Sequence, residues 1–281
     1  RLLTGCQGSF GVATMMNVKI FHKPLMQKVR FITFNSLEEA VMPFYAIQKR
    51  EIGHECFLLN SYAMAAIMAQ SQEEISALAK KIPPYVLVTN LWGGQFFPEE
   101  RLAYEAKAVD EIAEQYNLAT GERLDGVIEA NLRMQKMLTR PWEGEVYWKE
   151  RLSGGCLELV IESGLDKVPS YWKLFKGLAG EHGIDSRHLG LYIQPRQRAR
   201  VCHVEFHIPC DPDSPAEVAQ VKAFQRAAFE GLMNAGAFFY RPYYDWAKMI
   251  YARAGYTHEV IKKLKKILDP NMILNPGKLA L

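Results

Sequence analysis

Hydrophobic and polar positions along the chain follow two periods, one typical of strands and one typical of helices. Runs rich in β-branched and aromatic residues predict strands, and segments with apolar residues three and four positions apart predict helices. The predicted strands are 12–20, 85–92, 156–163, 188–195 and 200–209. The predicted helices are 36–49, 59–70, 72–81, 99–116, 123–138, 215–235, 243–253 and 257–268.

Two of these helices begin with clear capping sequences. Ser36 followed by Glu39 has the spacing of a capping box. Ser214-Pro215-Ala216-Glu217 places serine at the N-cap and proline at the first helical position. Gly236 is placed to end the second of these helices, and a short strand is expected at Phe239 and Tyr240.

The order of these elements predicts the fold class. Strands and helices alternate irregularly, which favours an α+β fold with a mainly antiparallel sheet and helices packed on one face. No internal repeat is visible in the sequence.

Composition restricts the class of protein further. The chain has 281 residues, 49% of them hydrophobic, and a net charge of +3 without a basic block, so we expect no nucleic-acid partner. No apolar run approaches the roughly 20 residues of a membrane span. The five scattered cysteines predict neither a disulfide framework nor a zinc ribbon.

We expect a cytoplasmic location, with the periplasm as the alternative. Because the chain begins abruptly at Arg1, we expect a further segment to precede it.

The clearest strand carries the first candidate chemistry. Side chains alternate along a strand, so Val204 and Phe206 face one way while His203, Glu205 and His207 face the other. The polar row is either a solvated face or the lining of a polar cavity, in which histidine can act as an acid or base near neutral pH. A metal site is the least favoured alternative, because residues two apart on one strand seldom converge on one ion.

Glycine-rich and turn-rich segments at the two ends are the second candidate. A G-x-x-G-x-x-G loop lets the backbone approach a phosphate or flat ring closely, although a plain tight loop has the same spacing. The tail forms two tight turns, which either tie down the C-terminus or present polar groups at fixed positions. The residues concerned are Gly5, Gly8, Ser9, Gly11, Asn275, Gly277 and Lys278.

Arg241 lies in an aromatic stretch, GAFFYRPYYDW, at residues 236–246. Its guanidinium is either stacked against Tyr243, Tyr244 and Trp246 or held as a fixed positive charge for a flat anionic ligand.

Three segments resemble the vanillyl-alcohol oxidase and 4-cresol dehydrogenase family of FAD-linked oxidases. They are GSFGVATMMNVKIFHKP (8–24), the stretch from Cys202 to Tyr243, and KKLKKILDPNMILNPGKL (262–279). The resemblance implies that residues 1–24 end an FAD-binding domain. Residues 25–238 would form a cap domain with a ferredoxin-like sheet that binds substrate, and residues 239–281 would return to the FAD-binding domain. The main FAD-binding half of the family lies outside this chain.

The resemblance also implies roles for individual residues. Tyr240 and Arg241 match a pair that holds a phenolate oxygen, and His203 matches an active-site histidine. Glu205 and His207 would line the substrate cavity or orient His203. The seven glycine-loop and tail residues named above would bind FAD. We expect this FAD to be non-covalent, because no histidine or tyrosine is clearly placed near 154–163 to attach it, and we expect no metal.

The implied reaction is oxidation of a para-substituted phenol or aromatic alcohol by hydride transfer to FAD. Two alternatives stay open: an FAD-linked 2-hydroxyacid dehydrogenase, which the absence of a histidine-rich metal loop disfavours, and a non-catalytic cap subunit that completes a partner's flavin site. The expected partners are the N-terminal FAD-binding half or subunit, an aromatic small-molecule substrate and a second copy of the chain in a homo-oligomer. Either oxygen or a cytochrome would accept the electrons.

Overall fold

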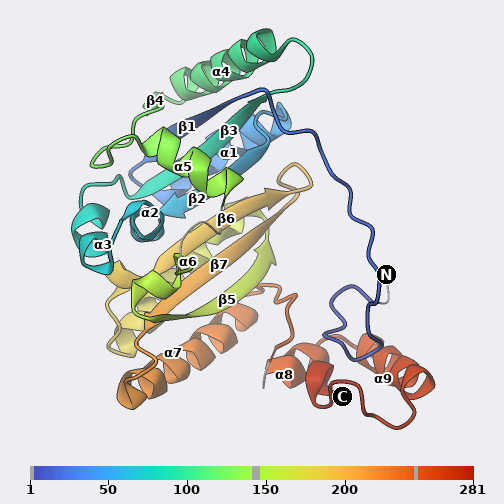
Figure 1. The fold of residues 1–281 in the computed structure, drawn as a ribbon. Coiled ribbons are helices and arrows are strands. Elements are labelled where there is room, and N and C mark those ends of the chain that lie inside the picture. Colours follow the sequence, from blue (N-terminus) through green and yellow to red (C-terminus); the bar gives the residue numbers. More distant parts are fainter. Residues whose placement is uncertain (1–2, 141–145, 244–245) are drawn as a thin grey trace. The chain divides into compact units, whose positions relative to one another are not determined.

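The computed structural model describes residues 3–140, 146–243 and 246–281, which fall into two compact units (Figure 1). One unit comprises His22–Phe238 and contains the whole sheet. The other comprises Arg1–Phe21 together with Phe239–Leu281, so the two ends of the chain fold together.

The sheet has seven strands in the order β4-β1-β3-β2-β6-β7-β5, and every neighbouring pair is antiparallel. This confirms the predicted α+β class with an antiparallel sheet. The strands are β1 (Met26–Phe34), β2 (Glu55–Asn60), β3 (Tyr85–Gly93), β4 (Thr120–Gly121), β5 (Gly155–Ser163), β6 (Gly190–Arg196) and β7 (Val201–Cys210).

The described residues form nine α-helices, eight of which overlap predicted helices. They are α1 (Leu37–Lys49), α2 (Ser61–Met68), α3 (Gln72–Ala79), α4 (Pro98–Gln115), α5 (Ala130–Thr139), α6 (Val168–Glu181), α7 (Pro215–Asn234), α8 (Trp246–Ala252) and α9 (Tyr256–Leu268). Both expected caps form: Ser36 and Glu39 make a capping box, and the Ser214 side chain accepts a hydrogen bond from the backbone N–H of Glu217.

The topology contains a repeat that the sequence pattern does not reveal. The order of elements β1-α1-β2-β3-α4-β4 with strand order 4-1-3-2 is the ferredoxin-like βαββαβ arrangement. Elements β5-α6-β6-β7-α7 repeat it, and after α7 a single bridge from Phe238 to Glu162 lies where the fourth strand would pair. The two repeats join edge to edge through β2 and β6.

Two of the predicted strands are wrong, and several elements of the structure were not predicted. Residues 12–20 belong to no strand; Val12, Met15 and Ile20 are exposed, so an apolar run without a pairing partner gave a false signal. The expected strand at Phe239 and Tyr240 is reduced to the neighbouring Phe238 bridge. Strands β1 and β2 and helix α6 were not predicted. In β1, charged side chains interrupt the apolar pattern, and one of them, Arg30, is satisfied by an ion pair to Asp110.

Helices cover both faces of the β1–β3 part of the sheet, whereas one covered face was expected. One face packs against α2 and α5 in a cluster that includes Val29, Phe31 and Val88. The other strand positions point the opposite way, and α1 and α4 contact β1 and β3 there (Figure 1).

The second repeat has an aromatic core beneath α6 and α7. Phe206 of β7 stacks on Phe175 of α6 at 4.8 Å between ring centroids, and Phe175 lies 5.0 Å from Phe224 of α7. All three rings are completely buried, as is Val204. The apolar face of β7 therefore packs beneath the helices, as its alternation predicts.

We expect Phe175→Ala to lower the free energy of unfolding by about 3–5 kcal/mol, because it leaves a cavity at the centre of three packed rings. Urea denaturation measures this. Phe96→Ala is the matched control, because the Phe96 side chain is 84% exposed and its loss should change stability by no more than about 0.5 kcal/mol. Equal effects of the two substitutions would contradict this description of the core.

Candidate functional site

The polar face of β7 forms a buried hydrogen-bond network centred on Glu205. His203 Nε2 lies 2.8 Å from one Glu205 carboxylate oxygen, and His207 Nε2 lies 3.0 Å from the other. An ionised carboxylate only accepts hydrogen bonds, so both imidazoles donate from Nε2. The side chains of His203, Glu205 and His207 are 9%, 13% and 0% exposed, which rules out a solvated strand face.

Two further residues, which the sequence analysis did not identify, complete this network. Lys149 Nζ donates to Glu205 Oε2 at 2.6 Å and also to the Glu158 carboxylate. Glu158 lies directly across from His207 in the β5–β7 ladder, so its place on the polar face of a predicted strand was a usable signal. Lys149 lies before the short 3₁₀ turn Glu150–Leu152 and reaches the sheet only in three dimensions.

The network fixes the charge of its members. Burial alone would raise the pKa of Glu205, but hydrogen bonds from His203 and His207 and the charge of Lys149 hold that pKa well below its usual range. Burial favours neutral Lys149, yet Glu205 and Glu158 outweigh it and raise the Lys149 pKa. Glu205 is therefore an anion and Lys149 a cation throughout the neutral pH range.

Some of these residues could also be ligands of a metal ion, the alternative that the sequence analysis favoured least. Glu158, Glu205 and His207 can each place a ligand atom within 4.8 Å of the others. The Lys149 ammonium, however, bonds both carboxylates, and it supplies the positive charge that a metal would bring. The geometry thus favours an ion-pair network at this position.

Two neighbours fix the position of the His207 ring: an aromatic ring packs against it, and a glycine leaves room for it. Trp148 meets its ring edge-on at 5.4 Å. Gly190, its partner in the β6–β7 ladder, has no side chain there; a Cβ would lie 2.6 Å from His207 Nδ1. Any larger residue at 190 would displace the imidazole. His207 Nδ1 is buried without a hydrogen-bond partner, which suits a neutral imidazole.

In the other unit, Lys265 joins the glycine loop to the C-terminal tail. Its side chain is completely buried in α9, and Nζ donates to Ser9 O at 2.8 Å, Leu274 O at 2.7 Å and Asp269 Oδ2 at 2.6 Å. The hydrogen bond from Lys265 lowers the Asp269 pKa. Asp269 also accepts from the backbone N–H groups of Ile273 and Leu274.

Three of the expected cofactor-binding residues, Gly8, Ser9 and Asn275, lie close together beside Lys265. The Asn275 side-chain amide donates to Gln7 O, within the glycine loop. A Cβ at Gly5, Gly11 or Gly277 would meet nothing within 4 Å, so these glycines border open space. Ser9 Oγ is buried without a partner. Open glycine backbone fits the approach of a flat or phosphorylated group; binding of FAD itself stays a prediction.

Tyr240 and Arg241 also belong to this unit, and both are half-buried. The Arg241 guanidinium carbon lies 5.3 Å from the centroid of the Tyr240 ring. Among the described residues, no carboxylate pairs with Arg241. The contact with the Tyr240 ring constrains the direction of the guanidinium; anion binding by Arg241 stays a prediction. The expectation that His203 joins this pair at one site stays a prediction.

Comparison with known proteins agrees with the fold. Residues 246–279 match the family "FAD linked oxidases, C-terminal domain". The fold is similar to that of p-cresol methylhydroxylase, solved with substrate bound, at 15% identity and a TM-score of 0.68, covering 92% of this chain and 53% of that one. It is also similar to alkyldihydroxyacetonephosphate synthase, at 14% identity and a TM-score of 0.59, covering 96% of this chain and 48% of that one.

The family match covers the C-terminal segment alone, and the structural matches show a shared fold. The chain spans about half the length of the solved structures that it matches. Comparison with curated proteins gave no match. Within the described residues, no helix has both the length and the apolar character needed to cross a membrane.

We expect stability to fall as the pH drops below about 6.5, the ordinary pKa of histidine. Burial, aided by the charge of Lys149, lowers the pKa of His207 against the opposing pull of Glu205 and Glu158. The unfolded chain therefore binds a proton that the folded chain does not, and protonation favours unfolding by up to about 1.4 kcal/mol per pH unit.

Urea denaturation between pH 7 and pH 5 measures this dependence. His207→Asn should flatten the slope, whatever it does to stability at pH 7. His22→Asn is the control, because His22 is exposed; its slope should match that of the unmodified chain. An unchanged slope in the His207 variant would refute the buried neutral imidazole.

We expect Lys265→Met to release the glycine loop from the tail, since it removes the donor to Ser9 O and Leu274 O. The backbone amide of Ser9 should exchange its hydrogen roughly tenfold faster or more. A tenfold change corresponds to the local stability that one hydrogen bond contributes. Lys266→Met, at the exposed neighbouring position, should leave exchange unchanged. Similar exchange in both variants would show that Lys265 does not hold these segments together.

Proposed function

We propose that this chain is the cap and C-terminal part of an FAD-dependent oxidoreductase that oxidises a para-substituted phenol or aromatic alcohol. Two features of this chain together support the proposal. Its fold matches p-cresol methylhydroxylase over 92% of its length, and the FAD-linked oxidase match begins at Trp246, just after Tyr240 and Arg241. The proposal includes membership of the vanillyl-alcohol oxidase and 4-cresol dehydrogenase family, which these two features support.

Arg241 would make the substrate's oxygen an anion. A phenol is neutral at pH 7, because its pKa is near 10. A guanidinium without a carboxylate partner favours the phenolate, and its planar donors suit a flat ligand. Tyr240, stacked on Arg241, would donate its hydroxyl hydrogen to the same oxygen. The resulting phenolate would push electron density through the ring toward the para position, so that hydride could be lost from the carbon attached there.

His203 would act on the proton or water side of the reaction. Its Nε2–H donates to Glu205, which fixes the direction of the imidazole. Glu205 and Lys149 orient the ring and keep its charged surroundings constant. His207, completely buried beneath Trp148, would position Glu205 without touching the substrate.

The glycine loop and the tail would bind FAD through Gly5, Gly8, Ser9, Gly11, Asn275, Gly277 and Lys278, without a covalent bond. When bound, FAD supplies the hydride acceptor. The protein contributes orientation and placed charge.

An N-terminal FAD-binding half or subunit is the partner that this arrangement requires. In the unit formed by the two chain ends, several large apolar side chains are exposed: Val12, Met15, Met16, Val18, Ile20, Phe21, Tyr256, Val260, Ile267 and Ile273. Its buried apolar set is small, with Phe10, Phe239, Ala247 and Leu279. An apolar surface of this kind indicates an interaction partner. A homo-oligomer, and oxygen or a cytochrome as electron acceptor, complete the proposal.

The joined protein, with its FAD-binding half, provides the direct test. It should be yellow, and the flavin absorbance should bleach when 4-methylphenol is added without oxygen. Bleaching by D-lactate instead would favour the 2-hydroxyacid alternative. A yellow protein that no phenol and no 2-hydroxyacid bleaches would favour a non-catalytic cap.

In the joined protein we expect Arg241→Met to reduce turnover by about two to three orders of magnitude, as for loss of a preorganised electrostatic donor. The melting temperature should change little. Lys248→Met is the matched control, because it removes one positive charge at an exposed position of the same unit. Unchanged turnover with a large loss of stability would instead assign Arg241 a purely structural stacking role.

A further inference from the structure

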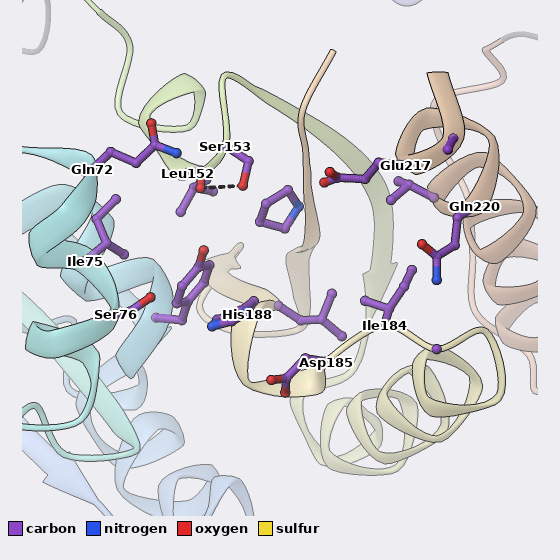
Figure 2. A pocket seen from close by; sticks show the side chains of 16 residues that line it. Gln72, Ile75, Ser76, Leu152, Ser153, Ile184, Asp185, His188, Glu217 and Gln220 are labelled. Atoms are coloured by element: carbon purple, nitrogen blue, oxygen red, sulfur yellow. Dashed lines mark hydrogen bonds between the residues drawn. The ribbon is translucent and has the colours of Figure 1, made fainter. Parts of the chain in front are cut away.

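Two adjoining hollows in the unit His22–Phe238 lie outside the network around Glu205. Their volumes are about 540 and 550 Å³, within the range of small-molecule sites. Both are lined by Tyr62, Ser76 and His188, so these three side chains form a shared wall. Figure 2 shows the first hollow between α3, which carries Gln72, Ile75 and Ser76, and α7, which carries Glu217 and Gln220.

Tyr62 is the unusual member of this wall. It is only 5% exposed, and burial raises its pKa to about 12, so the phenol keeps its proton. Its ring packs against His188, with centroids 5.5 Å apart. A buried tyrosine hydroxyl normally finds a hydrogen-bond partner, yet no described residue supplies one. The hydroxyl is therefore available to a ligand that enters either hollow.

The second hollow is cationic. Lys80 follows α3, Lys176 projects from α6, and Arg187 and His188 come from the 3₁₀ turn Ser186–His188. None of the described residues that line it is acidic. Arg187 is neutralised by Asp185, 2.6 Å away. The two lysines have no such acidic partner within the described chain, so their charges are uncompensated.

The walls of the second hollow are apolar and aromatic. Trp172, Tyr85 and Ile82 line it. The Trp172 indole N–H already donates to the Tyr85 hydroxyl at 3.0 Å, and the Lys176 ammonium lies 5.5 Å from the Trp172 ring. Uncompensated cations above an aromatic wall suit an anionic group attached to an apolar body.

The first hollow differs in charge. Its two acids are already engaged: Asp185 pairs with Arg187, and Glu217 accepts from the backbone N–H of Asp211. The remaining lining combines apolar Ile75 and Ile184 with uncharged polar side chains. It can therefore accept the uncharged end of a ligand that passes Tyr62.

We propose that these hollows form one binding site for a small organic anion. The ligand's carboxylate or phosphate would lie between Lys80 and Lys176, its apolar body against Tyr85 and Trp172, and a polar atom on the Tyr62 hydroxyl. The site belongs to the cap unit alone, and it does not depend on the proposed redox activity.

Calorimetric titration of this chain with benzoate, phenyl phosphate and inorganic phosphate tests the proposal. At least one of the organic anions should bind with a dissociation constant of about 1 mM or tighter. Whichever organic anion binds more tightly identifies the acid group. Tighter binding than inorganic phosphate shows that the apolar body contributes. No binding of either organic anion, or equal affinity of phosphate and the tighter organic anion, would overturn the proposal.

Variants then locate the site. Lys80→Met with Lys176→Met should weaken binding by about 10- to 100-fold, and Tyr62→Phe by about three- to tenfold. The matched control is Lys81→Met with Lys173→Met. These exposed lysines are neighbours in the sequence that do not line the hollow, and their loss changes the net charge equally. Equal losses in the two double variants would mean only general attraction to a basic surface, and would refute the site.

Discussion

The alternation of side chains along β7 is the constraint on which both the core of the second repeat and the candidate site depend. Val204 and Phe206 face α6 and α7, while His203, Glu205 and His207 face the network with Lys149. A shift of one residue in register would bury charges among aromatic rings and move the rings into the polar network. The aromatic stack on one face of the sheet and the ion network on the other therefore both fix the register of β7.

The network tolerates burial because its charges are matched. An isolated carboxylate as buried as Glu205 would take up a proton. Two imidazole donors and one ammonium keep it ionised, and Gly190 leaves room for the His207 ring. Lys265 solves a related problem in the other unit, where one buried ammonium satisfies two carbonyl oxygens and a carboxylate from segments far apart in sequence. In both places a buried lysine ammonium donates hydrogen bonds to backbone carbonyl or carboxylate oxygens that water does not reach. Apolar side chains cannot donate such bonds.

The two ferredoxin-like repeats place the ion network and the hollows at different positions in one unit. Their junction at β2 and β6 aligns the strands into one surface, and the network around Glu205 lies on β5, β6 and β7 within the second repeat. The hollows around Tyr62 use α2 and α3 from the first repeat together with α6 and α7 from the second. The network on the sheet and the hollows between the helices thus occupy different surfaces of one unit.

The sequence alone determined the α+β class, most helix positions, both serine caps and the division of β7 into an apolar and a polar face. Each of these depends on local spacing: a period of two, a period of three to four, or a cap three residues from its partner. The resemblance to FAD-linked oxidases likewise depended on short contiguous segments, and the match at residues 246–279 agrees with it.

Only the tertiary structure decided which segments pair with one another and which side chains meet in space. The run 12–20 has a strand's composition but no pairing partner, so it forms no strand. Strand β1 has charged interruptions but gains two partners, β3 and β4, and an ion pair for Arg30. Lys149 gave no local signal, because its carboxylate partners lie on β5 and β7. Lys265 pairs locally with Asp269, but its bond to Ser9 O joins positions 256 residues apart. Pairing, burial and charge matching are properties of neighbours in space, and a spacing pattern along one chain specifies a surface without specifying what covers it.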